Sequence, residues 1–184
     1  KTLYATLSHV SAMTVTEGVL AYTTVDGAFY AYSVSDVQDS GLYFYTDKVG
    51  YTDVYPYGKD VYVTQTDKGI VKAYSIEDKA FSGFEIASNS PAEHRLSQAT
   101  DATLHGNELW IADNGNRRLS VYDTKTQALH TRFAITHDVN FLAVDEDAVI
   151  TANPTQASVY DKSGALLTTL TVTDTDEIVG VAAV

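Results

Sequence analysis

The sequence predicts an all-β protein, and three of its features lead to this expectation. Its 184 residues include 13 tyrosines and 6 phenylalanines, and aromatic side chains suit the surface of pleated strands. There are only three prolines, and short polar clusters such as Asp26-Gly27 and Asn114-Gly115 are typical of the turns between strands. No stretch keeps the apolar spacing of an amphipathic helix for more than two turns.

An internal repeat makes the prediction more specific. Four segments share one pattern, in which a strand, a short polar turn and a second strand ending in a tyrosine follow one another. The tyrosines that mark the register are Tyr32, Tyr74, Tyr122 and Tyr160. Their spacing is close to the period of about 40 to 50 residues that is typical of propeller blades. The sequence therefore predicts a β-propeller built of four-stranded antiparallel blades.

Each blade is expected to contain an inner strand, a central hairpin and an outer strand. The four blades are predicted at residues 9–47, 50–87, 98–136 and 138–173, with one extra strand at each end of the chain, at 2–7 and 177–184. This arrangement leaves three expectations open, because an unpaired strand edge invites further pairing. The chain is an arc of a longer protein, a five-bladed ring with a thin last blade, or a propeller completed by strand pairing with a second chain.

Two of the four segments resemble known repeats. Residues 109–123, Leu-Trp-Ile-Ala-Asp-Asn-Gly-Asn-Arg-Arg-Leu-Ser-Val-Tyr-Asp, closely resemble an NHL repeat. Residues 61–75, Val-Tyr-Val-Thr-Gln-Thr-Asp-Lys-Gly-Ile-Val-Lys-Ala-Tyr-Ser, are similar to the YVTN-type repeat of bacterial surface propellers. The resemblance implies a β-propeller but no single activity, since this fold hosts many. It also implies structural roles, in which Asp113 caps its turn and Arg117 pairs with a neighbouring blade.

Charge and composition narrow the classes of partner. The chain has 24 acidic and 12 basic residues, which gives a net charge of −12 that repels nucleic acids and anionic lipids. No apolar run approaches the roughly 20 residues of a membrane-spanning helix, so we expect no membrane insertion. The absence of cysteine excludes disulfides, thiol catalysis and cysteine-ligated zinc. The composition favours an extracellular, periplasmic or cell-surface location.

A column of polar residues is predicted near the central channel of the propeller. Ser11, Asp53, Asp101 and Asn140 each precede the start of the second strand of their blade by the same interval. Oxygen ligands of this kind are those that Ca²⁺ prefers, so the column is a candidate metal site. The alternative is the polar lining of a water-filled channel. No other cofactor is predicted.

A second candidate site lies on the loops. The turns within the central hairpins and the connections between blades are expected to share one face, and long loops are often functional. We predict that four residues of these loops contact a partner, and they are His94, Arg95, Arg117 and His137. Solvated turns without such a role are the alternative.

These features support two hypotheses about function. The first is a non-enzymatic binding or scaffold module whose loop face binds a protein or a polysaccharide, or which docks into a larger surface complex. The second is a metal-dependent hydrolase that resembles the lactonase group of propellers, with the metal held by Asp53, Asp101 and Asn140. The sequence carries no P-loop, dinucleotide or Gly-x-Ser-x-Gly motif that would point to another chemistry.

Overall fold

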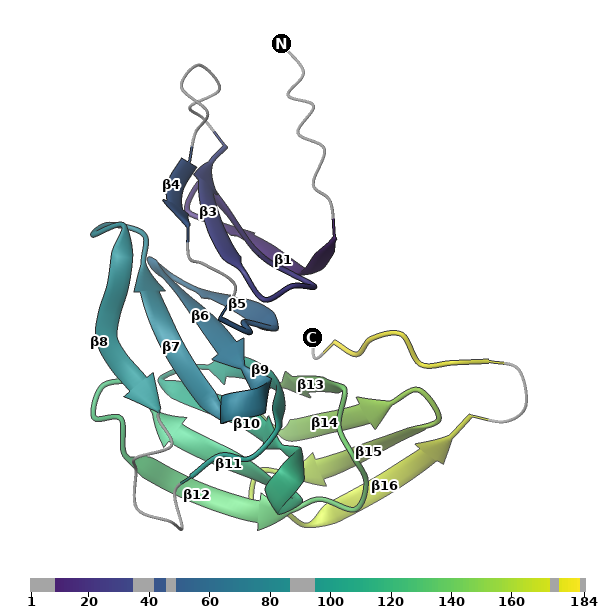
Figure 1. Cartoon of the computed structure of the whole chain (residues 1–184). Coiled ribbons are helices and arrows are strands. Elements are labelled where there is room, and N and C mark those ends of the chain that lie inside the picture. Colours follow the sequence, from purple (N-terminus) through teal and green to yellow (C-terminus); the bar gives the residue numbers. More distant parts are fainter. Residues whose placement is uncertain (1–8, 35–41, 46–48, 87–94, 173–175, 183–184) are drawn as a thin grey trace. The chain divides into compact units, whose positions relative to one another are not determined.

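The computed structural model describes residues 9–34, 42–45, 49–86, 95–172 and 176–182. These residues form four antiparallel sheets of four strands each, and in every sheet the strands are neighbours in chain order. The chain divides into two units, residues 1–88 and 89–184, and each unit holds two of the sheets (Figure 1). The predicted fold class, an all-β propeller built of four-stranded antiparallel blades, is confirmed.

The first unit contains blades 1 and 2. Blade 1 has a hydrogen-bonding irregularity near its beginning, where β1 pairs with β2 through Val10 and Ala12 but skips Ser11. The strands of the two blades are β1 (Val10–Thr16), β2 (Val19–Thr24), β3 (Phe29–Ser33) and β4 (Leu42–Tyr45), then β5 (Asp53–Tyr57), β6 (Asp60–Gln65), β7 (Ile70–Ser75) and β8 (Ala80–Ile86).

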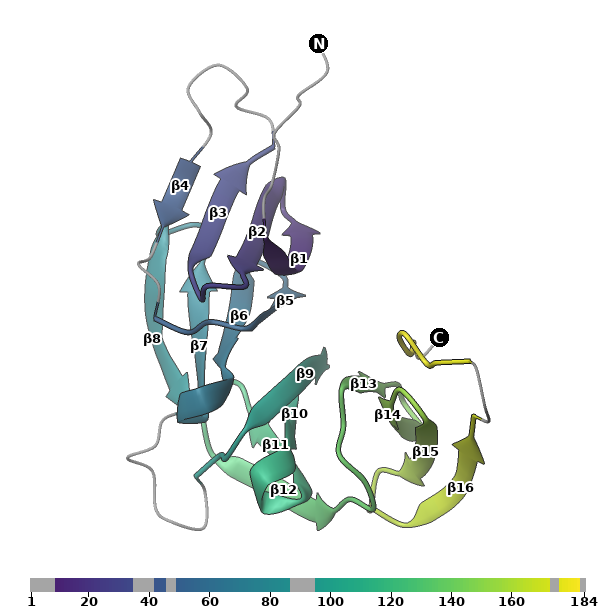
Figure 2. The same cartoon turned by 45° about the vertical axis from the view of Figure 1, so that its right-hand side comes forward.

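The second unit contains blades 3 and 4 and follows the same plan (Figure 2). Its strands are β9 (Ala99–His105), β10 (Glu108–Asp113), β11 (Arg118–Asp123) and β12 (Leu129–Ala134), then β13 (Phe141–Val144), β14 (Ala148–Asn153), β15 (Gln156–Asp161) and β16 (Leu166–Thr171). Short 3-10 turns, η1 (Thr66–Lys68) and η3 (Asn114–Asn116), connect the two middle strands of blades 2 and 3.

Each unit has its own hydrophobic core between its two blades. In the first unit, Phe29 of blade 1 meets Tyr74 of blade 2 in an edge-on contact with ring centroids 5.3 Å apart. In the second unit, Phe133 of blade 3 packs against Tyr160 of blade 4 at 5.7 Å. Complete burial of one such side chain contributes about 1.5–3 kcal/mol, so these contacts hold neighbouring blades together.

Side chains alternate between the two sides of a strand, so each blade has two faces. We call the face that packs on the following blade the leading face and the face that packs on the preceding blade the trailing face. In the first unit, blade 1 contributes a leading face and blade 2 a trailing face, formed by Val19, Ala21, Phe29 and Ala31 and by Val54, Val61, Val63 and Tyr74. In the second unit, blade 3 leads and blade 4 trails, through Trp110, Ala112, Leu119 and Val121 and through Leu142, Val149 and Tyr160.

The predicted end strands have different outcomes. Residues 2–7 lie outside the described residues. The strand expected at 177–184 is not formed over residues 176–182, which carry no strand in the structure. A strand requires a ladder of backbone hydrogen bonds, whereas here Ile178 N–H donates to the carbonyl of Pro154 in the turn between β14 and β15. None of the described helical turns has the length and apolar character that crossing a membrane requires.

Candidate functional site

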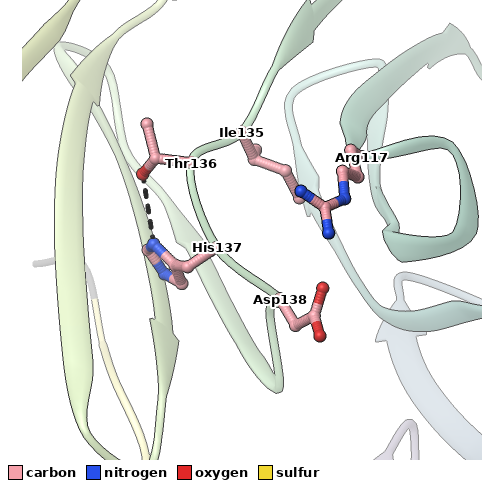
Figure 3. A pocket seen from close by; sticks show the side chains of 5 residues that line it. All are labelled: Arg117, Ile135, Thr136, His137 and Asp138. Carbon is pink, nitrogen blue, oxygen red and sulfur yellow. Dashed lines mark hydrogen bonds between the residues drawn. The ribbon is translucent and has the colours of Figure 1, made fainter.

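The candidate site is a hollow of about 210 Å³ in the second unit. Its walls come from the end of the η3 turn and from the loop between β12 and β13 (Figure 3), and the lining residues are Arg117, Ile135, Thr136, His137 and Asp138. Two of the four predicted partner-binding residues, Arg117 and His137, thus lie together although the whole of β11 and β12 separates them in the sequence.

A buried carboxylate fixes the turn that carries Arg117. Asp113, at the end of β10, is fully buried and accepts hydrogen bonds from Ser97 N–H at 2.6 Å and from Arg118 Nε at 2.7 Å. Asn116 Nδ2 donates to the same carboxylate at 2.9 Å. A buried charge of this kind is stable only when it is paired and hydrogen-bonded, as it is here. Asp113 is therefore structural, but it does not make the predicted side-chain capping bond to the η3 backbone, and its carboxylate is paired with Arg118.

The close approach of the preceding loop explains the glycine in this turn. Gly115 N–H donates to the carbonyl of Ser97 at 2.8 Å. A Cβ atom on Gly115 would overlap Ser97 Oγ and would lie 2.8 Å from the Ser97 carbonyl oxygen. Only glycine fits at this position, so the turn and the loop before β9 form one packed element that positions the next residues.

Arg117 follows this turn with an exposed side chain and a left-handed backbone. Its φ of 51° is unfavourable for a residue with a Cβ atom, and Gly69 occupies the equivalent place in blade 2 with a φ of 59°. Other described non-glycine residues also have positive φ, so the conformation alone is no sign of function. What distinguishes Arg117 is that it lines the hollow and, among the described residues, makes no ion pair.

His137 forms the opposite side of the hollow, over the sheet of blade 4. Its Nε2 lies 3.4 Å from Thr151 Oγ1, and its Nδ1 lies 3.3 Å from Thr136 Oγ1, the contact drawn in Figure 3. Burial lowers the pKa of His137, and this effect outweighs a backbone hydrogen bond involving Thr151 and the charge of Asp138, both of which raise it. The imidazole is therefore neutral at pH 7 and can both donate and accept a hydrogen bond.

Two lining residues, Thr136 and Asp138, were not among the predicted site residues. Thr136 is held by Tyr160, whose hydroxyl lies 3.1 Å from Thr136 Oγ1 and accepts from Thr136 N–H at 3.3 Å. Asp138 is exposed, and Figure 3 shows its carboxylate on the same side of the hollow as the Arg117 guanidinium. Both residues are adjacent to His137 in one short loop, and this adjacency is the signal in the sequence that could have identified them. The hollow thus offers a guanidinium, a carboxylate, a neutral imidazole and a hydroxyl group.

The other two predicted partner residues do not line the hollow. His94 lies outside the described residues. Arg95 is exposed, and its backbone carbonyl accepts hydrogen bonds from Asn116 Nδ2 at 2.9 Å and from Arg118 Nη2 at 2.8 Å. These contacts give the Arg95 backbone a part in supporting the η3 turn.

Strand pairing shows that only two residues of the predicted polar column occupy equivalent positions in their blades. Asp53 and Asp101 pair with Thr64 and Ala112, at equivalent positions of their blades. At the same position, blade 1 has Ala12 and blade 4 has Phe141, because these residues pair with Thr23 and Ala152. Ser11 and Asn140 lie one residue earlier, Ser11 at the position that β1 skips in its pairing and Asn140 directly before β13.

The polar residues of the column also have contacts of their own. Asp101 Oδ2 accepts from Leu142 N–H of blade 4 at 2.6 Å, and Ser11 Oγ donates to the Thr52 carbonyl before blade 2 at 3.3 Å. Both side chains therefore connect two blades. Burial raises the pKa of Asp53, while hydrogen bonds from Tyr55 and from Val54 N–H lower it.

A cation at this column stays a prediction. Within the described ranges, no three His, Cys, Asp or Glu side chains gather as a group that could hold a metal ion. Asp101 uses one carboxylate oxygen for Ala102 N–H and the other for Leu142 N–H, which leaves only its remaining lone pairs for a metal.

Comparison with known proteins supports the fold alone. No protein-family model matches the chain, and no curated protein matches it. Among solved structures, the chain is similar to the computationally designed Ika4 protein, with a TM-score of 0.63 and 16% identity over 94% of this chain and 96% of that one. It is also similar to the computationally designed Ika8 protein, with a TM-score of 0.61 and 16% identity over 89% of this chain. The chain spans 46% of the length of that Ika8 chain.

Proposed function

We propose that this protein is a non-enzymatic binding module of the β-propeller class, with blades of the NHL and YVTN type. The hollow between blades 3 and 4 is its recognition site, and the partner is a protein or a polysaccharide at the cell surface, in the periplasm or outside the cell. The observation that carries this proposal is that Arg117 and the pair His137 and Asp138, from two separate segments, line one open hollow.

The chemistry of the hollow fits recognition better than catalysis. Arg117 offers a planar set of donors, Asp138 offers acceptors, and the neutral His137 offers one of each. Such groups can hydrogen-bond to hydroxyl, carboxylate or amide groups of a partner. The described lining residues include no serine or cysteine, which a nucleophilic triad would need, and the Thr136 hydroxyl is already shared with Tyr160.

The backbone conformation of Arg117 allows an unusually sharp test. In Arg117→Gly, the side chain is lost from the hollow while the positive φ is relieved, because glycine adopts this conformation without steric cost. Most substitutions that weaken binding also weaken the fold, but this variant is expected to raise the free energy of unfolding by up to about 1–2 kcal/mol. Loss of binding in it would therefore be a loss of recognition and not of structure.

The experiment measures retention on immobilised probes of both partner classes. Chitin, xylan and alginate represent neutral and acidic polysaccharides, and a set of extracellular matrix proteins represents protein partners. We expect the natural sequence to be retained by at least one probe and Arg117→Gly to bind that probe at least tenfold more weakly. Lys125→Gly is the matched control, because Lys125 is an exposed cation of the same unit in the turn between β11 and β12 and does not line the hollow.

Two results would contradict the proposal. One is that no probe of either class retains the natural sequence at high micromolar concentration, which is chosen so that weak binding is also detected. The other is that Arg117→Gly and Lys125→Gly change retention equally, since the effect would then come from net charge and not from the hollow.

A further inference from the structure

Each unit has two outer blade faces on which no blade of the same unit packs, and on two of these four faces large apolar side chains are exposed. In blade 1 this is the trailing face, which consists of Met13, Leu20, Tyr22, Tyr30 and Tyr32. In blade 4 it is the leading face, which consists of Ile150, Ala152, Ala157, Val159 and Leu170. Both sets follow from strand pairing, because side chains on one face alternate along a strand and lie opposite each other across it.

The tyrosine of the repeat shows what the trailing face of blade 1 lacks. In blade 2, Tyr74 packs on Phe29 of the preceding blade, and in blade 4, Tyr160 packs on Phe133 of the preceding blade. Tyr32 occupies the same register position in blade 1, since it pairs with Leu20 as Tyr160 pairs with Val149. No preceding blade is present within the described part of the first unit to pack on Tyr32.

Aromatic stacking has shaped this face into a flat surface. The rings of Tyr22 and Tyr30 are nearly parallel, with centroids 4.8 Å apart and an angle of 10° between their planes. Tyr32 adds a third ring at 6.0 Å from Tyr22, tilted by only 8°. Met13 borders the stack and is 58% exposed. Three parallel tyrosines beside an exposed methionine are the kind of surface that is enriched where proteins associate.

The leading face of blade 4 supplies the complementary element. Leu170 pairs with Ala157 as Phe133 pairs with Leu119, so Leu170 stands at the position from which Phe133 packs on Tyr160. Leu170 is 66% exposed, although a leucine at this position is expected to be buried against the next blade. The neighbouring Ile150 and Val159 occupy the positions of Trp110 and Val121, which are core residues in blade 3.

We propose that these two faces bind each other between two copies of this chain, so that blade 4 of one copy packs on blade 1 of the other. The interface repeats the packing seen within each unit, with Leu170 of one copy against Tyr32 of its partner. The contact is head-to-tail, because blade 4 of one copy packs on blade 1 of the other. Two such contacts, one in each direction, join two copies into a closed dimer.

A second copy fits these faces for two reasons. First, one chain carries both halves of the contact, so identical copies provide every surface that the assembly needs. Second, two copies supply eight blades, which is within the range of about four to eight that propellers typically have.

Mass measurement by light scattering after gel filtration tests the proposal on the 184-residue chain. At micromolar concentration and above, we expect twice the 20.0 kDa mass of one chain. Met13→Asp changes only the face on blade 1 and Leu170→Asp only the face on blade 4, and each is expected to weaken association at least tenfold. Val25→Asp is the matched control, because Val25 is 73% exposed in a turn outside both faces.

Mixing the two variants distinguishes a head-to-tail contact from any other. In a mixture of Met13→Asp and Leu170→Asp, one contact joins two unaltered faces, so association should return in part although neither variant associates alone. A natural sequence that keeps the mass of a single chain up to high micromolar concentration would overturn the proposal. So would a dimer that survives both substitutions, or a mixture that stays monomeric. Fluorescence of Trp110 confirms that each variant is folded.

Discussion

The buried carboxylate of Asp113 gives the sharpest prediction about stability. Three donors converge on it, from the Ser97 backbone, the Asn116 amide and the Arg118 guanidinium, at 2.6–2.9 Å. Removal of the carboxylate in Asp113→Ala leaves the Arg118 cation, whose side chain is only 15% exposed, without its partner. Removal of one member of a buried ion pair costs about 3–5 kcal/mol, and we expect a loss near the lower end because Arg118 is not completely buried.

Blade 2 shows how the same position works without charge. Gln65 and Ile70 form the strand pair that corresponds to Asp113 and Arg118, and the Gln65 side-chain amide donates to the carbonyl of Val49. The double variant Asp113→Gln with Arg118→Ile copies this neutral arrangement into blade 3. Replacement of both members of a buried pair is often neutral, so we expect the double variant to lose less than about 1.5 kcal/mol.

Urea unfolding followed by tryptophan fluorescence measures these changes, because Trp110 is the single tryptophan of the chain and lies in β10, the strand that ends at Asp113. With a dependence of about 1–3 kcal/mol per molar urea, a loss of about 3 kcal/mol lowers the midpoint by roughly 1–3 M. If the cost of the double variant equals the sum of the costs of Asp113→Gln and Arg118→Ile measured singly, Asp113 and Arg118 are not coupled and the reasoning is wrong.

Three further predictions concern the second unit. Gly164→Ala is expected to lower the free energy of unfolding by about 2–4 kcal/mol, because the φ of Gly164 is 90° and a Cβ atom there would lie 2.5 Å from Phe133 Cγ. Thermal unfolding measures this loss, and an unchanged melting temperature would contradict the prediction. Asn114→Ala should lower the free energy of unfolding by about 1–3 kcal/mol, since the Asn114 side chain accepts from Val139 N–H and donates to Val139 O. A loss below about 0.5 kcal/mol, roughly half of one hydrogen bond, would show that Asn114 does not hold this loop in place. Burial lowers the pKa of His137 in the folded state, so the unfolded state binds more protons and the unfolding free energy falls as the pH drops below about 6.5. His137→Gln should flatten this pH dependence of the unfolding free energy between about pH 8 and 5.5, and an identical slope in the variant and the natural sequence would count against the reasoning.

Much of the architecture could be predicted because it depends on local patterns. Alternating side chains and turn residues predict strands at residues 10–16 and 129–135, and the structure has β1 at Val10–Thr16 and β12 at Leu129–Ala134. The tyrosine of the repeat marked the register correctly in all four blades, since it pairs with an apolar residue of the preceding strand each time. These features are set by a period of two residues that is visible in a single strand.

The candidate site was predicted only in part. Arg117 and His137 were identified as loop residues, and the structure brings them to one hollow. Ser11 and Asn140 do not share the register position of the two aspartates, because Leu20 and Val149, and not Val19 and Ala148, are the equivalents of Val61 and Leu109. Register is defined by pairing with the neighbouring strand, which equal spacing from the start of a strand does not record.

The sequence by itself determined the all-β class, the four-stranded repeat and the positions of the turns, because these follow from interactions between residues close in the chain. Only the tertiary structure decided that Arg118 neutralises Asp113 while the adjacent Arg117 enters the hollow. The reason is the left-handed backbone at residue 117, which ends the η3 turn and directs two neighbouring arginines to different surroundings. Which of two like side chains is buried with a charge depends on a packed environment that no local pattern contains.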